Sequence, residues 1–266
     1  MVSHARRERG GMGKERHPFY YLDGLVSLLL IDDDKQIRNM LGDLLAPIRI
    51  YTIKKASCAA QAEAILASPQ RTHLCVMDLG LSDIDKDEFY LLRRFGGRVS
   101  FVVLTGSNSP QKGFTAHQLG ARTIIEKGGG FDPSTFIRTV NHHALLNVIN
   151  PRYGMSADTL TASTDVLFRT SPQFVSEWAL ELGITDRELR NVWTKNLGAN
   201  TKIILAIHQM FSAALNYYEW VTSPVETYRN TAVEELSGYR RLEEYFHCHR
   251  SVITDFIEYG NVVNFL

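Results

Sequence analysis

The first half of the chain alternates short apolar runs with amphipathic stretches. An apolar run of about four to eight residues is typical of a strand buried on both faces of a sheet, whereas apolar residues at helical spacing indicate a helix. By these patterns the expected strands are Ser27–Asp32, Ile48–Ile53, His73–Met77, Val99–Leu104 and Arg122–Glu126. The expected helices are Lys35–Leu45, Ala56–Leu66, Glu88–Phe95, Ser109–Leu119 and Pro133–Val148. This alternation predicts an α/β fold with a doubly wound, five-stranded parallel sheet.

Polar side chains follow four of the expected strands, at the point where each strand ends. Asp32 and Asp33 end the first strand, and Asp78 follows the third. Thr105 and Lys127 follow the fourth and the fifth strand. Ligands of open α/β sheets bind beyond the carboxyl ends of the strands, so we expect these side chains to meet at one edge. Unrelated polar residues in loops are the alternative explanation.

This set of side chains suits phosphoryl chemistry. Several carboxylates at one edge repel one another and favour a divalent cation such as Mg²⁺, which prefers oxygen ligands. A lysine ammonium pairs with phosphoryl oxygens, and a threonine hydroxyl can donate a hydrogen bond to another. One carboxylate can then attack phosphorus and form an acyl phosphate. The residues therefore indicate transfer of a phosphoryl group onto an aspartate.

Four sequence motifs within residues 25–150 carry a family resemblance. They are, in order, LLLIDDDKQIRNML, CVMDLGL, VVLTGSN and IIEKGG. Together they resemble the receiver domain of two-component response regulators. The resemblance implies a flavodoxin-like fold and a sensor histidine kinase as the partner that supplies the phosphoryl group. It also implies a signalling protein rather than an enzyme, and a homodimer on phosphorylation, formed through the last two helices and the last strand of the sheet.

The same resemblance gives roles to the polar residues. It implies that Asp78 accepts the phosphoryl group and that Thr105 and Lys127 contact this group. The implied ligands of Mg²⁺ are Asp32, Asp33, Asp78 and the backbone carbonyl of Gly80. Asp33 is the direct ligand in this scheme, and Asp34 has no role.

The chain departs from the family pattern at three places. Ser82 and Gly128 stand where family members usually have proline. Because cis peptide bonds are essentially confined to proline, we expect a trans, mobile glycine loop after Lys127. Ile124 stands where the family has a Tyr or Phe that acts as a switch, and it has neither a hydroxyl nor a large ring. We therefore expect the phosphorylated state to be signalled differently or less completely.

The first aspartates permit another interpretation. Asp32, Asp33 and Asp34 after an apolar run resemble the opening motif of haloacid-dehalogenase-type phosphatases, in which the first aspartate is the nucleophile. That family's late acidic pair does not follow Lys127, and Asp78 would have no role. An aspartate-based phosphatase is therefore the weaker interpretation.

The second half of the chain is predicted to be helical. Pro172–Leu182 and a helix capped by Thr185 flank Gly183, which is typical of a helix-turn-helix. Residues 178–215 resemble the first helix-turn-helix unit of AraC-type transcription regulators. The polar face of the second helix and the residues after it suit DNA contacts. The expected DNA-binding residues are Arg187, Arg190, Asn191, Lys195 and Lys202. An ordinary helical hairpin with a polar exterior is the alternative.

Charge weakens the case for DNA binding. The chain carries 29 basic and 29 acidic residues, which excludes a uniformly basic nucleic-acid coat protein. From residue 155 to the end, nine basic residues stand against fourteen acidic ones. Phosphate neutralisation supplies much of the affinity for DNA. An output domain that works through protein contacts therefore stays open as an alternative.

Cysteine content and hydropathy complete the expected organisation. Three widely spaced cysteines and the lack of a long apolar run indicate a cytoplasmic protein with no membrane contact. The expected parts are a disordered basic tail (1–20), a receiver domain (21–150), a linker (151–171) and an all-α output domain with a helix-turn-helix (172–266). We expect a response regulator in which phosphorylation of Asp78 controls DNA binding and thereby transcription.

Overall fold

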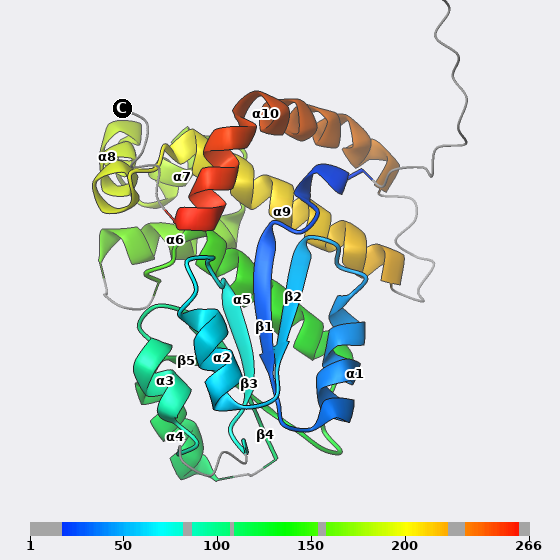
Figure 1. The fold of residues 1–266 in the computed structure, drawn as a ribbon. Helices are drawn as coiled ribbons and strands as arrows, with labels where there is room; N and C mark the ends of the chain where they lie inside the picture. Colours follow the sequence, from blue (N-terminus) through cyan, green and yellow to red (C-terminus); the bar gives the residue numbers. More distant parts are fainter. Residues whose placement is uncertain (1–17, 82–86, 107–108, 154–157, 223–231, 261–266) are drawn as a thin grey trace, which may run out of the picture.

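The structure is a computed structural model that describes residues 18–81, 87–106, 109–153, 158–222 and 232–260 (Figure 1). Its strands are β1 (Val26–Ile31), β2 (Tyr51–Ala56), β3 (Leu74–Asp78), β4 (Ser100–Thr105) and β5 (Ala121–Glu126). They form one sheet in the order β2-β1-β3-β4-β5, and every neighbouring pair is parallel. The sheet confirms the predicted doubly wound α/β fold.

Helices cover both faces of the sheet. They are α1 (Lys35–Leu45), α2 (Ala59–Leu66), α3 (Tyr90–Phe95), α4 (Pro110–Gln118) and α5 (Pro133–Ile149). Successive side chains of a strand point to opposite faces. Leu28 and Leu30 of β1 pack with α1 and α5, whereas Leu29 and Ile31 pack with α2, α3 and α4. β2 begins later than predicted because Ile48 belongs to a turn after α1, in which it accepts a hydrogen bond from the Tyr51 amide.

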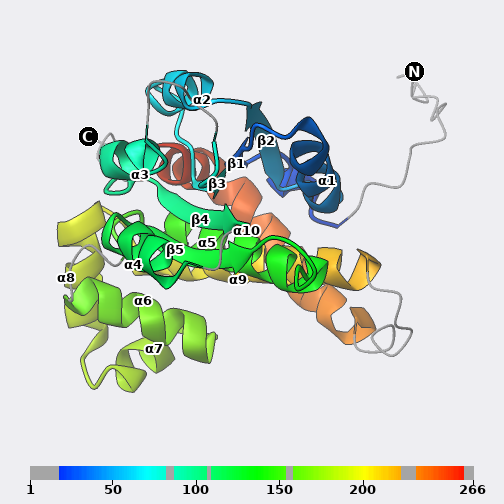
Figure 2. The ribbon, with the colours of Figure 1, turned by 90° about the horizontal axis from the view of Figure 1, so that it is seen from below.

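The C-terminal helices pack on the face of the sheet that is covered by α1 and α5. They are α6 (Thr159–Thr170), α7 (Val175–Glu181), α8 (Asp186–Leu197), α9 (Thr201–Thr222) and α10 (Ala232–Tyr259). α9 packs on α5 and α10 packs on α9 (Figure 1). Figure 2 shows α6, α7 and α8 at one side of the molecule and α1 and β2 at the other. One cluster of buried apolar side chains runs from the sheet through α5 into these helices.

The predicted linker at 151–171 contains a helix, α6. Asp158 caps α6 by accepting a hydrogen bond from the Thr161 amide. Ser163 and Thr164 gave the segment its polar composition, but both are buried, and their hydroxyls donate to the Leu160 carbonyl. Because the backbone satisfies these hydroxyls, a Ser- and Thr-rich helix can line the core.

The end of the predicted tail belongs to the fold. Residues 1–17 of that tail lie outside the described residues. Phe19 is completely buried, and a short 3₁₀ helix, η1 (Tyr20–Leu22), follows it. The Phe19 ring lies 5.7 Å from the ring of Tyr217 on α9, centroid to centroid. The start of the described chain is therefore attached to the C-terminal helices. None of the described helices is long and apolar enough to cross a membrane.

Candidate functional site

Two aspartates meet at the carboxyl edge of the sheet because β1 and β3 are parallel neighbours in register. Ile31 pairs with Met77, so the residues that follow them, Asp32 and Asp78, emerge side by side. Asp32 is 1% exposed and Asp78 is 9% exposed. Asp33, Asp32 and Asp78 each offer a carboxylate oxygen, and these atoms all lie within 4.8 Å of one another. Three hard oxygen donors at this separation fit a divalent cation such as Mg²⁺.

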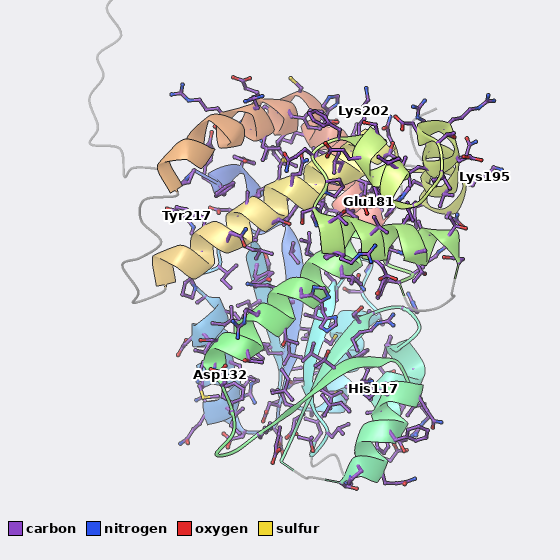
Figure 3. The ribbon with its side chains drawn as sticks, turned by 180° about the vertical axis from the view of Figure 1, so that it is seen from behind. His117, Asp132, Glu181, Lys195, Lys202 and Tyr217 are labelled. Atoms are coloured by element: carbon purple, nitrogen blue, oxygen red, sulfur yellow. The ribbon has the colours of Figure 1, made fainter. Side chains whose placement is uncertain are left out.

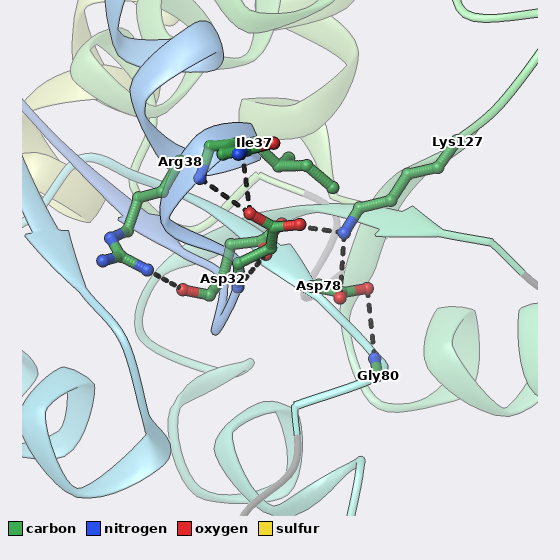
Figure 4. A network of polar contacts seen from close by, with 8 residues as sticks. Asp32, Ile37, Arg38, Asp78, Gly80 and Lys127 are labelled. Atoms are coloured by element: carbon green, nitrogen blue, oxygen red, sulfur yellow. Dashed lines mark hydrogen bonds and ion pairs between the residues drawn. The ribbon is translucent and has the colours of Figure 1, made fainter.

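Lys127 connects the two buried aspartates. Its Nζ lies 2.7 Å from Asp32 Oδ2 and 2.8 Å from Asp78 Oδ2 (Figure 4). Burial opposes the charge on Lys127, but hydrogen bonds to both carboxylates outweigh it and raise the pKa of the lysine. Burial raises the pKa of Asp32, and the neighbouring ammonium offsets only part of that rise. The site is thus a partly desolvated cluster of opposite charges.

The loop that carries Asp32 is fixed by its own backbone and by the start of α1. The Asp34 amide donates to Asp32 Oδ1 at 2.9 Å, and Arg38 Nη1 donates to the Asp32 carbonyl oxygen at 2.5 Å. Asp34 Oδ1 in turn accepts from the amides of Gln36 and Ile37 and so caps α1. Sequence reasoning left Asp34 without a role, although an Asp just before an amphipathic helix is a recognisable N-cap signal. It missed Arg38 altogether, because an arginine one turn into a helix gives no sign of its partner.

Gly80 and Thr105 lie at the same edge. The Gly80 amide donates to Asp78 Oδ1 at 3.1 Å. A Cβ at this position would lie 3.3 Å from Asp78 Oδ2, so the glycine leaves room beside the carboxylate. Thr105 ends β4, which is paired with β3, and its carbonyl accepts a hydrogen bond from the Lys127 amide at 2.7 Å. The predicted site residues are therefore brought together from four strand ends.

The departures from the family pattern have structural counterparts. Ile124 is half-buried and packs against α4, where a Cβ on Gly113 would lie 3.3 Å from its Cδ1. Gly128 has φ +115°, a conformation that favours glycine, and the described residues contain no cis peptide bond. The peptide bonds of the glycine loop are trans, as predicted, and Ser82 lies outside the described residues.

The predicted DNA-binding residues form a separate group on α8 and the start of α9. Thr185 caps α8 through a capping box with Glu188. Leu189 and Trp193 face inward, and Trp193 packs 5.3 Å from the ring of Trp178 on α7. The exposed residues of the group are Arg187, Arg190, Asn191, Lys195 and Lys202. Figure 3 shows Lys195 and Lys202 on the other side of the view from Asp132, the N-cap of α5.

The acidic edge lies in a part of the chain that is similar to a known protein family. Residues 28–141 match the family model of the response regulator receiver domain. This part of the chain is a receiver domain. It spans the sheet from β1 to the middle of α5, and the C-terminal helices lie outside the match. A comparison with curated protein sequences gives no match.

Solved structures similar to this chain include several receiver domains. The receiver domain of an HD domain-containing protein from Pseudomonas fluorescens is 26% identical, covers 45% of this chain and 94% of its own, and has a TM-score of 0.40. The HemR receiver domain from Leptospira biflexa is 25% identical, with the same coverages and TM-score. RcsB from Salmonella enterica, bound to a promoter, is 18% identical, covers 72% of this chain and 98% of its own, and has a TM-score of 0.39.

Proposed function

We propose that this protein is a two-component response regulator in which Asp78 accepts a phosphoryl group from a sensor histidine kinase. The observation that carries the proposal is the contact of one lysine, Lys127, with Asp32 and Asp78 at the edge of a receiver domain. Asp78 ends the central strand β3, so it is the carboxylate with polar partners on both sides. A cluster built this way can hold a doubly charged phosphoryl group between cations.

The chemistry follows from the positions of the side chains. Asp32, Asp33, Asp78 and the Gly80 carbonyl would hold Mg²⁺, which when bound neutralises charge on the transferring group. An Asp78 oxygen forms a bond to phosphorus while the bond from phosphorus to the donor's imidazole nitrogen breaks. Lys127, already against Asp78 Oδ2, turns its ammonium to a phosphoryl oxygen. The Thr105 hydroxyl donates a hydrogen bond to another phosphoryl oxygen.

Replacing Asp78 with asparagine is expected to abolish phosphorylation, because an amide oxygen is a poor nucleophile. The intact mass of the protein, measured after incubation with a small phosphodonor and Mg²⁺, should rise by one phosphoryl group in the wild type and stay unchanged in Asp78→Asn. Asp32→Asn should lower the yield without abolishing it. Asp87→Asn is a matched control, since Asp87 is exposed and pairs with Arg93 instead. Full phosphorylation of Asp78→Asn would end the proposal.

Replacing Lys127 with alanine is expected to leave Mg²⁺ binding intact and to uncouple phosphorylation from any downstream change. The ammonium occupies Oδ2 of both Asp32 and Asp78, so its removal takes away a competing cation. Titration calorimetry should give a dissociation constant for Mg²⁺ no weaker than that of the wild type. Clearly weaker binding in Lys127→Ala would show that the lysine supports the metal site.

We further propose that α8 enters the major groove of DNA, with Arg187, Arg190 and Asn191 reaching bases. Lys195 and Lys202 would reach phosphates. The support is a capped helix whose inner side is anchored by Trp193 and whose outer side is polar and exposed. A phosphorylated homodimer would read two half-sites about 34–36 Å apart, or a multiple of that spacing.

Replacing Arg190 with alanine is expected to weaken specific DNA binding about 5- to 150-fold and to relax specificity at one base position. Lys202→Ala should weaken binding to all sequences. It should also reduce the slope of the logarithm of the binding constant against the logarithm of the salt concentration by about one. Selection from random DNA followed by binding titrations tests both variants. Lys55→Ala is the matched control, because Lys55 is exposed on β2, at the other edge of the sheet from β5, and donates to Asn39 of α1.

An output through protein contacts is the second candidate. Phe174 and Leu180, at α7, are 65% and 77% exposed, so two large apolar side chains on this helix are available for protein contacts. The acidic excess after residue 155 also disfavours DNA. If the phosphorylated protein selects no preferred DNA site, or if Arg190→Ala binds such a site as the wild type does, this candidate replaces DNA binding.

A further inference from the structure

A half-buried arginine lies at the amino-terminal edge of the sheet, opposite the acidic site. Arg71 comes shortly before β3, and its guanidinium reaches the last turns of two helices. Nη1 donates to the Ile257 carbonyl of α10 at 2.8 Å, and Nη2 donates to the carbonyl and side-chain oxygens of Asn147 on α5 at 2.7 and 3.0 Å. The last carbonyls of a helix lack intrahelical partners and carry partial negative charge. Two helix ends therefore converge on one cation.

His73 provides a second contact with the same turn of α10. Its Nδ1 accepts a hydrogen bond from the Ser27 amide of β1 at 3.0 Å, so Nε2 carries the hydrogen. Nε2 then donates to the Ile257 carbonyl at 2.8 Å. His73 is 2% exposed and stands directly before β3, the strand that ends in Asp78. We call Arg71, His73 and the Ile257 carbonyl the α10 clasp.

The charged member of the clasp, Arg71, is half-buried. Arg71 forms no ion pair with a carboxylate among the described residues, and burial lowers its pKa to about 10. Asn147, which shares the guanidinium, is itself fixed by a hydrogen bond from its Nδ2 to Ser100 Oγ at 2.8 Å. Opening the clasp would return the guanidinium to water, which offsets part of the cost of losing the contact. The clasp is therefore easier to open than the apolar core around it.

α10 is interrupted before it reaches the clasp. His249 has non-helical angles, φ −118° and ψ 17°, and its ring lies 4.5 Å from the ring of Tyr245. Figure 1 shows α10 changing direction before its last part runs down to the sheet. This last part, residues 250–259, buries Ile253, Phe256 and Ile257. Helices bend sharply where their hydrogen-bond ladder is broken, so His249 is a hinge between two halves.

We propose that residues 250–259 are a strap that docks on the receiver domain through the α10 clasp and undocks as a unit about His249 while the sheet stays folded. In the docked state the strap attaches the C-terminal helices to the receiver domain. The attachment is at Arg71, where the C-terminal end of α5 meets the start of β3. Undocking removes this attachment and leaves the packing of α9 on α5 in place. The strap thereby determines how rigidly the C-terminal helices are attached to β3, the strand that carries Asp78.

Hydrogen exchange of the full chain, followed by mass spectrometry, tests the proposal in Arg71→Met. This variant keeps an apolar stem but loses the donors to Ile257 and Asn147. Amides of residues 250–259 should exchange at least about tenfold faster than in the wild type, the loss expected for hydrogen bonds to a charged group. Amides of β1 and β4 should exchange as in the wild type. Arg93→Met is the control, because Arg93 is exposed and pairs with Asp87.

A pair of glycine variants separates loss of the clasp from a general loss of stability. Gly260 follows α10 with φ +74°, and a Cβ there would lie 3.2 Å from Arg71 Nη1 and from Pro151 Cγ. Gly183 has nearly the same φ, +68°, but a Cβ there would meet nothing within 4 Å. Gly260→Ala should speed exchange in residues 250–259, and Gly183→Ala should not. Wild-type exchange of the strap in Arg71→Met, equal acceleration by the two glycine variants, or acceleration spread over the whole chain would each overturn the proposal.

Discussion

The Trp193→Ala variant is expected to lose about 3–5 kcal/mol of unfolding free energy, the cost of truncating a large buried aromatic side chain. Trp193 is completely buried on α8 and packs against Trp178 of α7, with an angle of 58° between the rings. The contact joins the two helices around Gly183, so the cavity would open between them. Urea denaturation followed by circular dichroism measures the loss.

Two further variants show whether the loss comes from packing. Trp193 Nε1 has no hydrogen-bond partner among the described residues, so Trp193→Phe sacrifices no hydrogen bond and should lose less than half as much as the alanine variant. Trp178 Nε1 donates to the Ser163 carbonyl at 2.8 Å, so Trp178→Phe should lose about 1 kcal/mol more than Trp193→Phe. A Trp193→Ala variant as stable as the wild type would show that α8 is not anchored by this contact.

Acid is expected to destabilise the protein steeply between about pH 6 and pH 4, because two buried histidines, His73 and His208, and the half-buried His143 are held in neutral form. Burial lowers the pKa of His73 to about 3, and it lowers the pKa of His143 and of His208 to about 4. Above the ordinary histidine pKa of about 6.5 the folded and unfolded chains bind the same number of protons at these sites. Below it the unfolded chain takes up protons that the folded chain cannot, so the unfolding free energy falls. The limiting slope is about 1.4 kcal/mol per pH unit for each histidine.

The carboxylates of Asp32 and Asp132 do not cause the fall in unfolding free energy between about pH 6 and pH 4. The raised pKa of Asp32 acts in the opposite direction, since a group protonated more readily in the folded chain gains stability as the pH falls. The pKa of Asp132 is lowered by hydrogen bonds from Thr135 and Ser134, and that contribution is lost only near and below pH 4. Urea denaturation at a series of pH values gives the slope.

Histidine variants identify the groups responsible. His208→Gln should reduce the slope by the contribution of one histidine, at most about 1.4 kcal/mol per pH unit. His247→Gln, a substitution at an exposed side chain, serves as the control. An unfolding free energy that is constant from pH 6.5 to pH 4.5 would contradict neutral burial of these histidines.

Local patterns predicted the sheet and its acidic edge well. Strands buried on both faces are continuous apolar runs, and the residue after each run marks the carboxyl edge, so Asp32, Asp78 and Lys127 could be placed together from the sequence. Asp132 and Pro133 marked the start of α5 for a similar local reason, an N-cap followed by proline. These signals depend only on neighbouring residues.

Contacts between distant segments could not be predicted. The partners of Arg71 lie 76 and 186 residues away along the chain, and no periodicity connects them. α6 lies in the segment predicted to be a linker, and composition does not reveal that Ser163 and Thr164 satisfy their hydroxyls on the helix itself. Phe19 falls in the predicted tail. Its burial depends on contact with Tyr217 of α9, which the local sequence does not reveal. In each case tertiary packing decided the structure.

The position of the phosphoryl group tests the central claim most directly. Borohydride reduces the acyl phosphate of an aspartate to homoserine, so reduction of the phosphorylated protein followed by peptide mass spectrometry reads the acceptor by residue. We predict homoserine at position 78 and unchanged aspartates at positions 32 and 33. Homoserine at position 32 would contradict this account and favour an aspartate-based phosphatase, in which Asp32 is the nucleophile.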